Sequence, residues 1–224
     1  MDMTSDHSGA MLPKLRQDYL HLLLDGRRVE AMQAMIDVVD DGLPLETTYV
    51  DVIQPVMYEV GRLWQTDQID IATEHYITAA TQVLMARLFP QTLSRRRNMR
   101  RMVGCCLGSE LHELGMRMVC DLFEFEGWDT YFLGATIPAK SLVRTISSHR
   151  PDLICLSATM AFGLPKIREV IRGLREAADG PPPRILVGGL PFLINPKLYV
   201  PVGADGTAPD AREAVRVAAA LFNE

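Results

Sequence analysis

The sequence has no segment that could cross a membrane. No apolar run approaches the roughly 20 residues that a spanning helix needs, and the first residues carry no signal-peptide pattern. We therefore expect a cytoplasmic protein without membrane association. The formal net charge of −5 also argues against a surface given over to nucleic acid.

Cysteine is scarce, and its spacing excludes the common zinc and disulfide patterns. The four cysteines form no C-x-x-C pair, and all fall in expected strands or helices: Cys105, Cys106, Cys120 and Cys155. Such residues are typical of small buried hydrophobes in a reducing compartment. The sequence also lacks a P-loop, an H-E-x-x-H pair and a Ser/His/Asp triad, so we do not expect an enzyme.

What the first part of the chain does have is helical periodicity. Apolar residues recur at helical spacing and predict four helices, over about 12–24, 28–39, 45–64 and 71–93. Asp70 is the expected N-cap of the fourth helix, and Pro55 should kink the third. Short turns between the helices favour an antiparallel four-helix bundle over residues 13–93, preceded by a disordered segment, 1–12.

A basic segment follows the bundle. Residues 94–101 hold five arginines in eight positions: Arg95, Arg96, Arg97, Arg100 and Arg101. Two interpretations are open: a solvated linker, or an electrostatic contact with a nucleic acid or an acidic partner.

The remainder, residues 102–224, alternates strand and helix patterns. Strands are expected over 102–107, 129–133, 153–158, 184–188 and 199–203, and helices over 112–126, 138–149, 164–178 and 209–222. This order predicts an α/β domain, in which a parallel sheet carries helices on both faces and binds ligands at the carboxyl ends of its strands.

Residues suited to a ligand site follow several of these strands. In the motif Glu110-x-His112-x-x-Gly115, Glu110 can accept a hydrogen bond from one ring nitrogen of His112, which leaves the other for a metal. Gly115 removes a side chain where a bulky group could pass. The simpler alternative is an ordinary loop histidine. Two further pairs follow later strands and should lie on the same edge: Ser157 with Thr159, and Gly188 with Gly189.

The spacing of these elements resembles the cobalamin-binding fold shared by methionine synthase, the B12 mutases and the B12 photoreceptors. The resemblance implies a Rossmann-like (flavodoxin-like) domain with His112 as the lower cobalt ligand. It implies that the displaced dimethylbenzimidazole tail is lined by Ser157 and Thr159 and given room by Gly188 and Gly189. Leu111 and Gly206 would complete the cofactor contacts, although Gly206 can equally belong to a plain turn. The chain departs from the family in carrying Glu110 where most members have Asp, and Thr159 where many have Leu.

The bundle carries a second signature, Trp64 followed after nine residues by Glu74-His75. Taken alone, Trp64 could cap the bundle core and His75 could sit in the first turn of a helix, where the dipole favours neutral imidazole. Upstream of a cobalamin motif, the set resembles the CarH/LitR group of adenosylcobalamin photoreceptors. That resemblance implies a bundle that caps the corrin, with Trp64 on the adenosyl group and Glu74 contacting or orienting it. His75 would become the upper cobalt ligand after light has removed that group.

The resulting expectation is a cobalamin-binding light sensor that regulates transcription, takes adenosylcobalamin, forms a homo-oligomer and signals through a protein partner. Nothing in the sequence corresponds to the MerR-type winged helix-turn-helix of CarH repressors, so direct DNA binding is not expected. The alternatives are a corrinoid methyl-carrier subunit of a methyltransferase system and an antirepressor-type or bilin- or haem-associated tetrapyrrole sensor. No cysteine motif for bilin attachment stands out.

Overall fold

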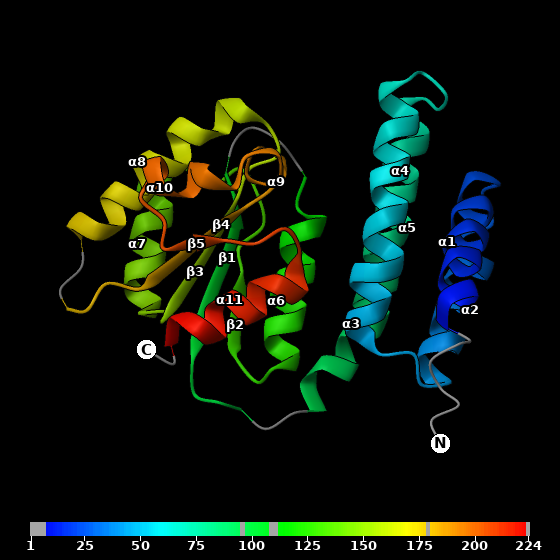
Figure 1. Cartoon of the computed structure of the whole chain (residues 1–224), viewed down its shortest axis with the longest axis horizontal. Coiled ribbons are helices and arrows are strands. Elements are labelled where there is room, and N and C mark those ends of the chain that lie inside the picture. Colours follow the sequence, from blue (N-terminus) through cyan, green and yellow to red (C-terminus); the bar gives the residue numbers. More distant parts are fainter. Residues whose placement is uncertain (1–7, 95–96, 108–111, 178–179, 223–224) are drawn as a thin grey trace. The chain divides into compact units, whose positions relative to one another are not determined.

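The computed structural model describes residues 8–94, 97–107, 112–177 and 180–222. The chain divides into two compact units, Met1–Gln91 and Thr92–Glu224. The first is built of helices, and the second is an α/β unit around one sheet (Figure 1).

The helical unit contains the expected helices. Its long elements are α1 (Ser8–Leu24), α2 (Arg28–Asp40), α4 (Gln54–Gln65) and α5 (Ile71–Leu88), with the short α3 (Leu45–Thr47) ahead of α4 and a 3-10 segment, Phe89–Ser94, after α5. Helix α1 begins at Ser8, so the expectation of disorder over 1–12 is wrong for residues 8–12. Ser8, Gly9 and Ala10 give no apolar periodicity, but a helix once nucleated extends without it.

The distortion expected at Pro55 takes the form of a π-helical turn, Thr48–Ile53, directly before α4. Pro55 has no N–H to donate, and its ring would clash with the carbonyl group of Asp51 in a regular α-helix. In the structure Gln54 N–H donates to the Tyr49 carbonyl instead. The Asp51 carbonyl accepts a hydrogen bond from Arg16 Nε of α1. The wider turn therefore solves the packing problem that proline creates.

The sheet of the α/β unit has the strand order β2-β1-β3-β4-β5, with all pairs parallel. Its strands are β1 (Arg101–Cys106), β2 (Asp129–Phe132), β3 (Leu153–Ser157), β4 (Arg184–Gly188) and β5 (Gly206–Thr207). The helices are α6 (Leu114–Phe125), α7 (Ala139–His149), α8 (Leu164–Glu176), α9 (Leu190–Ile194), α10 (Tyr199–Val202) and α11 (Ala211–Phe222). The predicted α/β class is confirmed.

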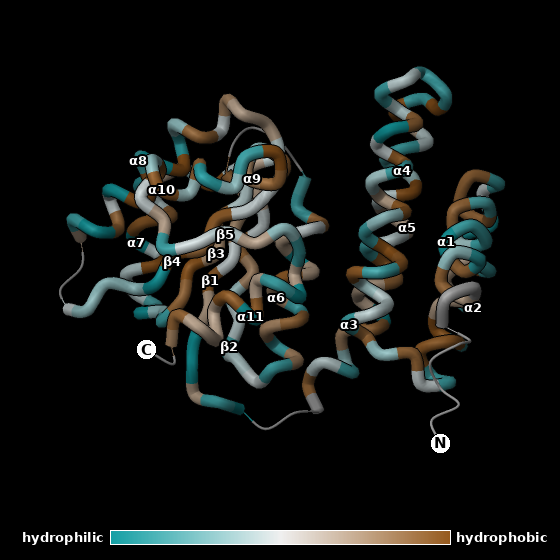
Figure 2. The backbone as a smooth tube through the Cα atoms, in the orientation of Figure 1, coloured by the Kyte–Doolittle hydropathy of each residue, from teal (hydrophilic) through white to brown (hydrophobic). Residues whose placement is uncertain are grey.

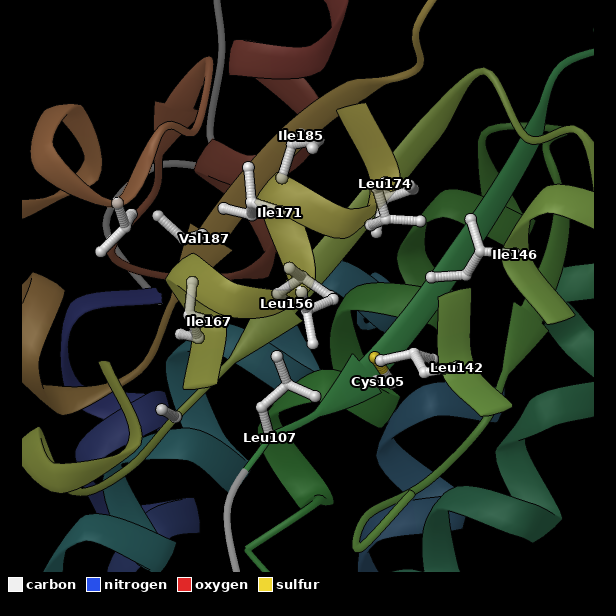
Figure 3. Packing of buried hydrophobic residues seen from close by; sticks show 14 of the residues in the cluster. Cys105, Leu107, Leu142, Ile146, Leu156, Ile167, Ile171, Leu174, Ile185 and Val187 are labelled. Carbon is white, nitrogen blue, oxygen red and sulfur yellow. The ribbon is translucent and has the colours of Figure 1, made fainter. Parts of the chain in front are cut away.

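Each face of the sheet has its own apolar core. Helices α7 and α8 pack on one face, where Leu142, Leu156 and Ile171 meet with many other aliphatic side chains (Figure 3). Helices α6 and α11 pack on the other face around Phe123 and Trp128. The helices of both units alternate hydrophobic and hydrophilic stretches along the chain, as amphipathic helices do (Figure 2).

The strand expected over 199–203 is wrong. Residues Tyr199–Val202 form α10, and the fifth strand is the two-residue β5. The run Tyr-Val-Pro-Val has β-forming side chains, but one helical turn suffices to bury Val202 in the core, and Gly203 ends it with φ +88°. A Cβ on Gly206 would lie 3.0 Å from Leu186 Cδ2, so packing explains this glycine of β5.

The arginines of the basic segment that the structure describes have partners within the α/β unit. Arg97 forms a salt bridge with the buried Glu124 and donates a hydrogen bond to the Trp128 carbonyl oxygen at 2.6 Å. The guanidinium of Arg100 lies 4.6 Å from the centre of the Phe222 ring. Arg101 Nε lies 3.5 Å from Asp129 Oδ2. At these positions the arginines contact the α/β unit, although residues 97–99 and Arg101 are exposed to solvent.

Candidate functional site

A topological switch point lies between β1 and β3. These strands are neighbours in the sheet, but β1 leads to α6 on one face while β3 leads to α8 on the other. The two connections diverge at the carboxyl ends of the strands, and in α/β sheets ligands bind in the resulting crevice. We call the carboxyl ends of β1, β3 and β4, with the residues that follow them, the carboxyl edge.

Strand register places predicted site residues together on this edge. Ser157 lies opposite Gly188 on β4 and opposite Cys106 on β1. The ladder extends one step further, because Leu107 N–H donates to the Ser157 carbonyl oxygen at 2.7 Å. Ser157 and Thr159 are both half-buried. The edge therefore offers two hydroxyl groups beside a glycine that has no side chain.

His112 lies near this edge, two residues before α6 begins, and its side chain is exposed. Its backbone carbonyl oxygen accepts a hydrogen bond from Cys106 Sγ at 3.4 Å. From its sequence position Cys106 is expected only to be a small buried residue, and no sequence signal points to this contact. Glu110 and Leu111 lie outside the described residues, so the hydrogen bond expected between Glu110 and His112 stays a prediction.

The glycines of the motif differ in what the protein itself requires of them. Gly189 has φ +99°, and a Cβ there would lie 2.0 Å from the Ala158 carbonyl oxygen. Gly189 therefore has to lack a side chain, because the segments that follow β3 and β4 pass close to each other there. A Cβ on Gly188 would meet only the Ala208 carbonyl oxygen at 3.8 Å, and one on Gly115 would meet nothing within 4 Å. Gly115 therefore leaves open space, whereas a side chain at Gly188 would make an ordinary van der Waals contact.

In the helical unit, Trp64 and the pair Glu74-His75 flank the turn between α4 and α5 (Figure 1). Asp70 caps α5 as expected, accepting from the Thr73 N–H at 2.7 Å. In the first turn, Glu74 Oε2 lies 2.5 Å from His75 Nδ1, and Glu74 Oε1 accepts from Thr78 Oγ1 at 2.9 Å. With Nδ1 engaged, Nε2 is the ring nitrogen that can bind a metal.

Trp64 and His75 are both exposed, whereas Glu74 is mostly buried. Trp64 is 39% exposed, and the His75 side chain is 72% exposed, whereas that of Glu74 is 17% exposed. The expectation that Trp64 could cap the core therefore does not account for the whole ring. The arrangement holds an apolar plane and an oriented imidazole at one end of the unit.

The donor set fits a corrinoid better than a bare metal ion. Within the described ranges, no group of three or more His, Cys, Asp or Glu side chains could hold a metal ion. A corrin supplies its own equatorial ligands, so that one axial imidazole is sufficient. His112 on the carboxyl edge and His75 on the helical unit are each suited to that role.

No helix in the part of the chain that the structure describes is long and apolar enough to cross a membrane.

Fold and site together define a helical unit followed by a Rossmann-like cofactor-binding unit. A family model described as the B12 binding domain matches residues 100–216, and a second of the same description matches residues 15–89. The chain therefore belongs to the B12-binding domain family, and it is a cobalamin-binding protein.

The relatives of this chain differ in function. The HTH-type transcriptional repressor CarH of Myxococcus xanthus is 27% identical over 68% of this chain and 51% of its own length. Dimethylamine corrinoid protein 1 of Methanosarcina mazei is 26% identical over 83% of this chain and 82% of its own. A corrinoid protein of Desulfitobacterium hafniense is 24% identical over 93% of this chain and 97% of its own length. This chain thus spans about half the length of the repressor.

A solved structure shows the same fold across both units. The monomethylamine corrinoid protein of Methanosarcina barkeri superposes with a TM-score of 0.79 at 20% identity, covering 93% of this chain and 97% of its own. At this identity the likeness establishes the fold, and the function has to be argued from the residues.

Proposed function

We propose that this protein is a cobalamin-binding light sensor that acts in regulation as a homo-oligomer in the cytoplasm, through a protein partner. The observation that carries the proposal is the exposed set on the helical unit, in which Trp64 presents an apolar plane and Glu74 orients His75. A protein that only carries methyl groups needs no second imidazole with a fixed tautomer.

Roles for the remaining residues follow from their positions. His112 would hold the cobalt from the α/β unit, and Ser157 and Thr159 would receive the polar tail of the cofactor beside Gly188, which has no side chain. Adenosylcobalamin, when bound, supplies a cobalt–carbon bond that light can break. Trp64 would cover the adenosyl group through its exposed ring face. His75 would offer Nε2 as a ligand that is available only after that group has left.

A corrinoid methyl carrier is the second candidate. Two of the three relatives described above are corrinoid proteins, and they match more of this chain, and more of their own length, than the CarH repressor does. By themselves, the comparisons favour the carrier over the sensor. In a carrier, His112 and the carboxyl edge would serve the same purpose, while Trp64 and His75 would have no light-dependent role.

The test is reconstitution with adenosylcobalamin in the dark, followed by absorption spectra and size-exclusion chromatography before and after green light. A sensor converts to a spectrum with histidine on both sides of the cobalt, and its elution shifts. His75→Ala should bind in the dark but fail to give that spectrum, whereas His21→Ala, another exposed histidine of the same unit, should behave as wild type. A bound cofactor that ignores light and exchanges only with methyl donors would establish the carrier instead.

A further inference from the structure

Cys106 connects the end of β1 to the residue expected to bind cobalt. It is the last residue of β1 and is 5% exposed, and its Sγ donates to the His112 carbonyl oxygen at 3.4 Å. The sheet fixes the position of Cys106 itself, because its N–H donates to the Gly134 carbonyl oxygen at 2.9 Å. A thiol on a rigid strand thus reaches the backbone of a residue six positions further along.

The other cysteines on this face of the sheet have packing roles. Cys155 on β3 lies opposite Gly104, two residues deeper in the sheet than Cys106. Cys120 Sγ lies so close to Gly104 that a Cβ there would come within 2.5 Å of it. Both belong to the apolar core beneath α6 and α11. Cys106 differs because its thiol also holds a backbone group at the carboxyl edge.

We propose that Cys106 is a positioning residue, which holds the backbone of His112 and thereby sets where its imidazole lies at the carboxyl edge. The inference rests on His112 being the lower cobalt ligand, as in the proposed function. Groups that orient a metal ligand commonly change metal affinity by about 10–100-fold when they are removed. Because this hydrogen bond is a weak one from sulfur and acts through the backbone, we expect the lower end of that range.

The experiment uses the full chain labelled with ¹⁵N-histidine and loaded with cobalamin, reduced to the Co(II) form. Electron paramagnetic resonance then reports through the nitrogen hyperfine splitting whether a histidine holds the cobalt. Cys106→Ala should reduce the ratio of histidine-bound to unbound cobalt by about tenfold. Cys106→Ser, which keeps a donor, should restore most of it. Cys155→Ala, which removes one buried sulfur from the neighbouring strand, should match wild type.

Further variants keep the test decisive. If the cavity left by alanine unfolds the protein, Cys106→Val fills the space without a donor and should show the same loss. Retention of the wild-type ratio in a folded Cys106→Ala or Cys106→Val protein would overturn the positioning role. His112→Ala separates the two ideas: a histidine splitting that survives this change means that His112 is not the ligand, in which case the proposed function fails first.

Discussion

Gly189 and Gly115 both belong to the cobalamin pattern, but the structure gives them different reasons to be glycine. Gly189 has a left-handed backbone and contacts the Ala158 carbonyl group, whereas Gly115 is helical and has open space around it. The sequence pattern alone treats them alike. Only the positions of neighbouring backbone atoms distinguish a glycine that the fold needs from one that a ligand could need.

Substitution of these glycines should therefore separate folding from binding. Gly189→Ala should cost about 2–4 kcal/mol of unfolding free energy, from the left-handed backbone and the clash together. Gly115→Ala should leave stability unchanged or raise it by up to about 1 kcal/mol, because alanine favours a helix. Urea unfolding of the cofactor-free protein measures both.

Substitution of Gly115, which should not harm stability, should instead weaken the binding of cobalamin. If the cofactor passes over the start of α6, Gly115→Ala should weaken binding, measured by equilibrium dialysis, although the protein stays folded. Equal affinities for Gly115→Ala and wild type would show that the open space at this position is not used.

Because its cysteines are buried, the stability of the protein depends on pH in the alkaline range. Burial raises the pKa of Cys155 to about 12 from its ordinary value of 9.0, and raises the pKa of Cys120 and Cys105 as well. Unfolded thiols ionise above about pH 9, while the folded thiol stays protonated until about pH 12. The stabilisation is complete below pH 9 and is lost as the pH rises through this window.

Stability should therefore fall above pH 9, by up to about 1.4 kcal/mol per pH unit for each such group. Chemical denaturation at a series of pH values measures the slope, and Cys155→Ala should make it shallower. A slope that is the same in Cys155→Ala and wild type would mean that other groups dominate.

At the scale of the element, the first turn of α5 depends on its cap. A hydrogen bond from the Thr73 side chain lowers the pKa of the Asp70 carboxyl group most, and one from the Thr73 backbone N–H lowers it further. The capped turn carries Glu74 and His75, so the cap also fixes the backbone from which the imidazole is presented. This element was predictable, because an N-cap followed by helical periodicity is a local signal.

Asp70→Ala should lower the melting temperature by a few degrees and loosen the turn that holds His75, whereas Asp70→Asn keeps an acceptor and should lose less. Since the folded pKa is lowered, the charged cap stabilises above the ordinary carboxyl pKa and loses this effect as the pH falls through the folded pKa. Thermal melts at pH 7 and in acid measure both effects. A melting temperature of Asp70→Ala equal to that of wild type would indicate that the cap has no role in stability.

Elements defined by distant contacts were less predictable. The strand expected over 199–203 is a helical turn because Val202 reaches the core from it, and the β-forming side chains of Tyr199 and Val200 gave the opposite local signal. The π-helical turn before Pro55 has a local cause in the proline, but the hydrogen bond that its Asp51 carbonyl oxygen accepts comes from Arg16, 35 positions away in the sequence. Neither the helical turn at Tyr199–Val202 nor this contact with Arg16 has a signature within one stretch of the chain.

At the scale of the molecule, each unit carries its own candidate cofactor-binding groups. The α/β class and the gathering of Ser157 with Gly188 on one edge follow from alternation and from parallel pairing, whereas the strand order comes from the structure. The contact of Cys106 with His112 and the roles of the arginines Arg97 and Arg100 do not, since they depend on side-chain packing. The division into two units makes their separate responses to cobalamin measurable.

Calorimetry of the full chain should resolve the two candidate functions. Each unit has its own buried residues, so we expect separate transitions, and a ligand at a hundredfold excess over its Kd stabilises the unit that binds it by about 2.7 kcal/mol. For a light sensor, adenosylcobalamin in the dark should stabilise the helical unit more than methylcobalamin does. Illumination should remove this difference, and so should Trp64→Ala. Tyr58→Ala, which removes another exposed aromatic residue of α4, should leave it intact. For a methyl carrier, the two cobalamins should stabilise the helical unit equally, because no part of that unit would be specific for the adenosyl group. Trp64→Ala should then change the stabilisation by both cobalamins to the same extent.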